Sequence, residues 1–133
     1  WPDAVRTWAR SYREVFARHT PLIAVIAVLQ VSGAPRTLAM YEAVTEGFLR
    51  AGWNQARIIP AIVALESFIF GSAFDAVAPT DIFDTGSLAS ESPLFTAAVA
   101  AAPGRESGKA AEQAFETGLD ALIHGFAGTP SGN

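Results

Sequence analysis

Side chains able to perform catalysis are few in this sequence, and none stands in a recognisable constellation. The chain has no cysteine, one lysine (Lys109) and two isolated histidines, His19 and His124. The lack of cysteine excludes disulfides, thiolate metal sites and cysteine catalysis. Neither histidine has a His or Glu partner at the spacing of a helical metal site, and no phosphate loop or nucleophile elbow is present. We therefore expect no enzyme activity, no cofactor and no metal.

Glu66 is the most informative polar residue, because it lies in a long apolar segment on the same helical side as Val63 and Phe70. A buried carboxylate must be paired, hydrogen-bonded or neutral, since an unpaired buried charge is costly. One interpretation is a polar contact to a ligand. The slightly favoured alternative is a structural ion pair with an arginine or a contact across a dimer. The candidate arginines are Arg13, Arg36 and Arg57.

Aromatic side chains recur at helical spacing along much of the chain. For any single one, ordinary core packing is the favoured interpretation. For the set as a whole we favour a cavity for an apolar ligand, with two tyrosine hydroxyls to orient it. The set comprises Trp8, Tyr12, Phe16, Tyr41, Phe48, Phe70 and Phe74.

The composition indicates one folded domain with an extra buried surface. Of 133 residues, 50% are hydrophobic and 17% charged, which excludes a disordered chain. The net charge of −4 argues against a nucleic-acid-binding surface on this chain. A mean hydropathy of +0.28 is high for a monomer and favours a dimer interface or an apolar cavity. The longest apolar run, Leu22–Leu29, is too short to cross a bilayer, so we expect no membrane segment and a cytoplasmic location.

Alanine-rich, helically periodic segments predict an all-α domain of five main helices and one short helix. Asp3 and Asn54 are candidate N-caps, and Gly52 is a candidate C-cap. The segment that starts at Asn54 is apolar nearly all round and is the predicted central helix. A second wholly apolar segment is predicted to be buried, and 79–93 is predicted to be a mobile loop. The expected helices are Asp3–His19, Pro21–Val31 (apolar), Pro35–Ala51, Asn54–Val77 (central), Leu94–Ala102 and Ser107–Phe126.

Several short motifs recur in an order typical of one family. They are His19-Thr20-Pro21, Gly33-Ala34-Pro35, Leu49-Arg50-Ala51-Gly52-Trp53, Leu65-Glu66-Ser67-Phe68-Ile69-Phe70-Gly71 and Phe115-Glu116-Thr117-Gly118-Leu119. In order and spacing they resemble the C-terminal regulatory domain of tetracycline-repressor-type transcription factors, over nearly the whole chain.

The resemblance implies an effector-binding and dimerisation domain over residues 1–127, with a disordered tail at 128–133. It implies a homodimer formed as a four-helix bundle by the segments 54–77 and 107–126. The protein would be a regulator, a repressor, whose DNA binding responds to a small apolar or amphipathic effector. Operator DNA would be contacted only by an N-terminal helix-turn-helix domain outside this chain.

The resemblance and the residue pattern together define two sets of site residues. The expected ligand-binding residues are Trp8, Tyr12, Phe16, Met40, Tyr41, Val44, Phe48, Val63, Glu66, Phe70 and Phe74. The expected dimer interface comprises Leu65, Phe68, Ser72, Ala111, Ala114, Phe115, Gly118, Leu119 and Leu122, because small residues between larger ones let helices approach closely. The competing hypothesis is a homodimeric scaffold without a ligand, and a small helical enzyme ranks last.

Overall fold

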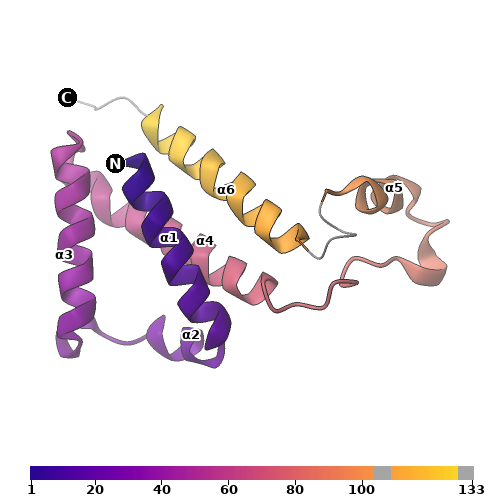
Figure 1. The fold of residues 1–133 in the computed structure, drawn as a ribbon, viewed down its shortest axis with the longest axis horizontal. Coiled ribbons are helices and arrows are strands. Elements are labelled where there is room, and N and C mark those ends of the chain that lie inside the picture. Colours follow the sequence, from indigo (N-terminus) through magenta and orange to yellow (C-terminus); the bar gives the residue numbers. More distant parts are fainter. Residues whose placement is uncertain (104–108, 129–133) are drawn as a thin grey trace.

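The computed structural model describes residues 1–103 and 109–128, and its regular structure there is entirely helical (Figure 1). This confirms the all-α prediction. The predicted helix start at Ser107, and the predicted tail beyond Gly128, lie outside the described residues. The α-helices are α1 (Pro2–Arg18), α2 (Pro21–Ile26), α3 (Pro35–Arg50), α4 (Ile58–Asp75), α5 (Pro93–Ala101) and α6 (Ala110–Ala127), and the 3₁₀ turns are η1 (Val31–Gly33), η2 (Gln55–Arg57) and η3 (Gly86–Leu88).

Proline and glycine set many of the helix boundaries. Proline is the first residue of α1, α2, α3 and α5, where the missing N–H costs nothing. The N-cap of α1 is Trp1 rather than Asp3. Asp3 lies in the first turn, where its negative charge interacts favourably with the helix dipole. Gly52, at φ 81°, ends α3 as predicted. The side chain of Asn54 accepts a hydrogen bond from the Ala56 N–H at 2.9 Å and caps η2, so α4 itself begins only at Ile58.

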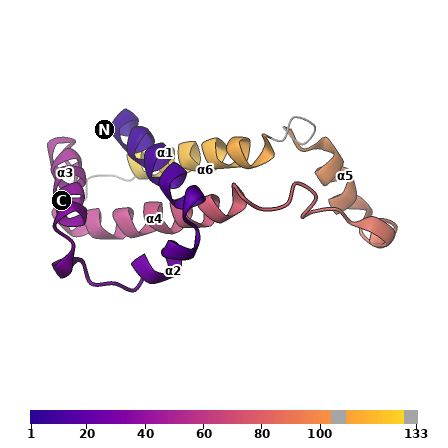
Figure 2. The same cartoon turned by 60° about the horizontal axis from the view of Figure 1, so that its bottom comes forward.

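Helix α4 is the central helix, as predicted, with α1 crossing it and α6 beside it (Figures 1 and 2). Its coverage is incomplete, however. Ile59 is 63% exposed and Val63 is 54% exposed on a side of α4 that no other element covers. The core formed by α1, α3, α4 and α6 comprises Val5, Ala9, Phe48, Ile58, Ala61, Ile62, Leu65, Ile69, Phe115, Leu119 and Ile123.

The prediction that the second segment is a buried helix is wrong. Helix α2 has only six residues, and Ile23 alone is buried, against Phe16 and Ala73. Leu22 and Val25 are about half exposed. The reason is geometric: α2 lies below one end of α1 (Figure 2), so a single side chain reaches the core and the others face outward.

A ladder of three ion pairs joins α1 to α6. The pairs are Arg6–Asp120 at 3.0 Å, Arg10–Glu116 at 2.7 Å and Arg13–Glu112 at 2.6 Å. The three acids are four residues apart on α6. Their residue numbers fall as those of the paired arginines on α1 rise, so the two helices run antiparallel. The hydrogen bond from Arg10 lowers the pKa of Glu116 and raises that of Arg10.

The side chain of Arg13 is only 11% exposed and makes further contacts that Arg6 and Arg10 do not make. It donates to the Ser72 carbonyl of α4 at 3.3 Å and to the Ala111 carbonyl of α6 at 3.5 Å. Its guanidinium also lies over the Phe115 ring, 4.5 Å from the centroid. A single planar cation therefore fixes three helices together.

Residues 78–103 form an arm that projects from the helical body (Figures 1 and 2). Phe83 and Phe95 pack edge to face with centroids 6.2 Å apart, and the hydroxyls of Thr85 and Thr96 are 3.0 Å apart. The predicted irregular stretch at 79–93 is confirmed apart from η3 and the first residue of α5, and its mobility stays a prediction. The arm's exposed apolar residues are Ile82, Phe83, Leu88, Leu94 and Phe95.

One stretch of the described chain, Gln55–Asp75, is long and apolar enough to cross a membrane by length and composition. The expectation of no membrane segment rested on the apolar run Leu22–Leu29, which is shorter. Core helices of water-soluble proteins pass the same test, and α4 carries six buried residues in the position of a core helix. The test alone is therefore weak evidence for a membrane segment.

Replacing Arg13 by Met is expected to lower the free energy of unfolding by about 2 kcal/mol, because the Glu112 carboxylate and two carbonyls lose their donor. Arg10→Met is the matched control on the same helix. Arg10 is half exposed, so its loss should cost clearly less. Urea unfolding followed by circular dichroism measures both, and equal losses would contradict the special role of Arg13.

Candidate functional site

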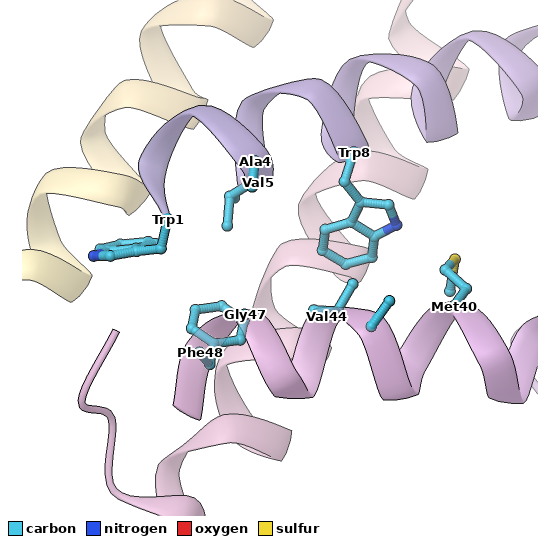
Figure 3. Close-up of a pocket in the computed structure, with 9 residues that line it drawn as sticks. Trp1, Ala4, Val5, Trp8, Met40, Val44, Gly47 and Phe48 are labelled. Carbon is cyan, nitrogen blue, oxygen red and sulfur yellow. The ribbon is translucent and has the colours of Figure 1, made fainter. Parts of the chain in front are cut away.

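A cleft of about 300 Å³ lies between α1 and α3 (Figure 3). Its walls are almost wholly carbon, and they follow helical spacing: the cap residue at position 1 and positions 4, 5 and 8 on α1 face positions 40, 43, 44, 47 and 48 on α3. Such a surface binds apolar matter and offers few hydrogen-bonding groups. The lining residues are Trp1, Ala4, Val5, Trp8, Met40, Ala43, Val44, Gly47 and Phe48.

Aromatic rings close one end of the cleft. Trp1 lies 5.8 Å from Phe48 and 5.3 Å from Trp53, measured between ring centroids. Gly47 keeps the wall open beside them, because a Cβ built there would meet nothing within 4 Å. The volume of the cleft thus depends in part on the missing side chain at this position.

Trp8 and Met40 form the other end. Figure 3 shows the indole nitrogen of Trp8 on the side toward Met40, away from Trp1. This nitrogen is buried, and no acceptor among the described residues is within hydrogen-bonding distance. An unsatisfied buried donor costs free energy, so this end of the cleft favours a ligand that brings an acceptor.

A polar centre formed by Tyr12, Tyr41 and Glu66 lies beyond Trp8, further along α1. The Tyr41 hydroxyl donates to Glu66 Oε1 at 2.6 Å, which joins α3 to α4. The ring of Tyr12 stacks on Trp8 with centroids 5.8 Å apart. The polar centre is therefore one ring away from the cleft.

Burial governs the ionisation of the polar centre. It raises the pKa of Glu66, with the Tyr41 hydrogen bond acting in the opposite direction. Burial, and then the Glu66 charge, raises the pKa of Tyr12 to about 12. The pKa of Tyr41 is raised by burial and by its hydrogen bond to Glu66. Both phenols consequently keep their protons at neutral pH, and the Tyr41 hydroxyl donates its proton to the hydrogen bond with Glu66.

Most of the predicted ligand-binding residues cluster here. Trp8, Met40, Val44 and Phe48 line the cleft itself. Tyr12, Tyr41 and Glu66 form the polar centre, and Phe16 and Phe70 pack on the far side of Tyr12. The outliers are Val63 and Phe74, which are 54% and 50% exposed and line no part of the cleft. They lie on the uncovered side of α4.

Among the residues that the structure describes, Glu66 forms no ion pair with an arginine: its hydrogen-bond partner is Tyr41, and Arg13 bonds to Glu112. The alternative of a contact across the dimer stays a prediction. Sequence reasoning also missed five wall residues. Each of these residues lies three, four or seven positions from Trp8, or from Met40 or Val44. This helical spacing could have placed them on the same faces of α1 and α3. The missed residues are Trp1, Ala4, Val5, Ala43 and Gly47.

The predicted dimer residues divide into two groups. Three of them are at most 1% exposed within one chain, namely Leu65, Phe115 and Leu119. They have no surface that a partner subunit could contact, so their assignment to the dimer interface is wrong. Phe68 and Gly118 contact each other: a Cβ at Gly118 would lie 2.6 Å from the Phe68 ring. Small residues on α6 thus serve first to bring α6 close to α4 within the subunit.

The remaining members of the set lie around this contact. Leu122 packs against the same core, and the carbonyls of Ser72 and Ala111 accept hydrogen bonds from Arg13. Ala114 is exposed.

One family comparison covers nearly the whole chain. The model of the tetracyclin repressor-like C-terminal domain matches residues 1–129. The chain belongs to this family. Tetracycline repressor-like C-terminal domains bind ligands and dimerise in transcriptional regulators, and the family is not one of enzymes. No curated protein matches the chain.

Glu66→Gln in this repressor-like domain is expected to change stability with pH. A raised folded-state pKa means that the Glu66 contribution is fully present at acid pH and is lost as pH rises through that pKa. The variant should therefore match the wild type near pH 4 and exceed it near pH 8, by less than about 1 kcal/mol because the carboxylate is only partly buried.

Urea unfolding at the two pH values measures this difference. Glu42→Gln neutralises an exposed carboxylate on α3 and should show no such gain. A variant less stable than the wild type near pH 8 would mean that the Glu66 charge is stabilising.

Proposed function

We propose that this chain is the effector-sensing and dimerisation part of a transcriptional repressor. In this proposal a small apolar or amphipathic effector occupies the cleft between α1 and α3, and the domain acts in the cytoplasm as a homodimer. Operator DNA is contacted by an N-terminal helix-turn-helix domain, in keeping with the net charge of −4 on the chain itself.

The observation that carries the proposal is the cleft. Its volume of about 300 Å³ is at the lower end of small-molecule sites. Aromatic rings form both ends, and one of them carries the unsatisfied Trp8 donor. A solid core would have filled the space at Gly47 and provided an acceptor for Trp8.

Helix α1 supports a route from the effector to the rest of the dimer. One side of α1 forms a wall of the cleft, and another side carries the ladder to α6. A ligand that displaces α1 from α3 would therefore displace the partners of the ladder as well. Regulation then requires that the effector bind two arrangements of α1 and α6 with different affinity.

Small residues, all exposed except the partly buried Ala64, support a dimer face on α4 and α6. They recur with the same three- and four-residue steps on both helices, next to the Phe68–Gly118 contact. A groove of about 700 Å³ lies at one end of this face, between the base of the arm and the first half of α6. A two-fold partner would bury both, giving a four-helix bundle. The residues of the dimer face are Ala64, Ser67 and Gly71 on α4 and Ala114, Thr117 and Ala121 on α6.

Filling the cleft should abolish effector binding without loss of fold. The test is Gly47→Leu, whose side chain enters open space in the wall. N-phenyl-naphthylamine, a neutral apolar dye that fluoresces out of water, is the probe. We expect the wild type to bind the dye and Gly47→Leu to lose at least about tenfold in affinity, equivalent to about 1.4 kcal/mol.

Gly47→Ala is the matched control, because it makes the same gain in helix propensity, about 1 kcal/mol, yet adds a single carbon. It should keep most of the dye binding and unfold at a higher temperature than the wild type. A wild type that does not bind the dye would favour the scaffold hypothesis, and equal binding by all three proteins would place the dye elsewhere.

A charge at the dimer face should separate the subunits. Ala121 is exposed within one subunit, so Ala121→Glu leaves the core intact. Two-fold symmetry brings two such charges together, and we expect the dimer dissociation constant to rise by at least about a hundredfold. Sedimentation velocity measures the change, with Ala39→Glu on the exposed side of α3 as control. An unchanged dimer would rule out this face.

A further inference from the structure

We propose that the effector is an amphipathic amine, with an apolar body in the cleft between α1 and α3 and a protonated nitrogen directed to Glu66. This inference rests on the function proposed above, since it names the chemistry of a ligand for the same cleft. Its basis is the position of Trp8 and Met40 at one end of the cleft, with the Tyr41–Glu66 hydrogen bond beyond that end.

Glu66 lacks a cation. Among the residues that the structure describes, it forms no ion pair with any Lys, Arg or His, and its hydrogen-bond partner is the Tyr41 hydroxyl. Arg13, one of the arginines considered as a partner for Glu66, instead bonds to Glu112 and to the carbonyls of Ser72 and Ala111. Oε2 of Glu66 therefore has no hydrogen-bond donor in the described part of the chain. A carboxylate of this kind gains most from a ligand that supplies a positively charged donor.

The surroundings of Glu66 suit a cation with an apolar body. Tyr12 is close enough to Glu66 for the carboxylate to raise the pKa of its hydroxyl, and Trp8 stacks on the Tyr12 ring. An ammonium group is attracted both to the carboxylate and to the faces of such rings. An anionic ligand would meet the Glu66 charge, and none of the described residues that line the cleft is basic, so the site selects against acids.

Trp8 connects the cleft to the polar centre. Its ring lines the cleft, while its unsatisfied Nε1 lies at the end toward Met40, the residue before Tyr41 (Figure 3). A ligand body that fills the cleft therefore ends where the polar groups begin. An ether, carbonyl or hydroxyl oxygen next to the amine would satisfy the Trp8 donor.

Three naphthyl compounds of the same shape test the inference: naphthylmethylamine, naphthylmethanol and naphthoate. Each competes with N-phenyl-naphthylamine for the wild type at neutral pH. We expect the amine to bind at least about tenfold tighter than the alcohol, and the acid weakest. In Glu66→Gln the advantage of the amine over the alcohol should fall to about one. In Glu42→Gln, which removes an exposed charge from α3, the advantage should persist.

The outcomes separate this inference from the proposed function. Equal displacement by the three compounds, with Gly47→Leu still blocking the dye, would overturn the amine and leave the effector cleft in place. An amine advantage that survives in Glu66→Gln would also overturn it, because the preference would then arise elsewhere. Absence of dye binding to the wild type would overturn both.

Discussion

The packing of this domain depends on the position of α1, and Arg13 makes the contacts that hold α1 in place. The side chain ties α1 to a carbonyl of α4 and to a carboxylate, a carbonyl and an aromatic ring of α6. Arg6 and Arg10 extend the attachment along the helix. With one side of α1 committed to α4 and α6, the opposite side is left to face α3. The cleft exists because this second contact is made by widely spaced rings and is interrupted at Gly47.

Contacts between α3 and the rest of the body are of a different kind. Phe48 and Trp53 anchor one end of α3 in the core, with ring centroids 4.5 Å apart. The middle of the helix is joined to α4 through the Tyr41–Glu66 hydrogen bond. That bond carries a cost, since the carboxylate is partly desolvated. A domain selected for stability alone would favour an apolar pair at these positions, which makes the polar pair more readily understood as part of a binding site.

Local features of the sequence predicted much of this architecture. Helical periodicity identified α1, α3, α4 and α6, and aromatic spacing identified the cleft residues Trp8 and Phe48. The ladder was not foreseen, because its partners are about a hundred residues apart and the pairing depends on how α1 and α6 pack. The matching spacing of the acids at 112, 116 and 120 was the available signal. Residues in contact across α4 and α6, such as Phe68 and Gly118, were assigned to a dimer because periodicity does not say which neighbour a face meets.

The arm at 78–103 leaves the body between α4 and α6 and holds itself together through its own threonine and phenylalanine pairs. Both walls of the cleft and all three ladder pairs lie outside it. A protease that cut the arm would therefore leave two fragments still joined by the ladder and the shared core. For the same reason, insertions and deletions should accumulate in the arm during evolution without disturbing ligand recognition.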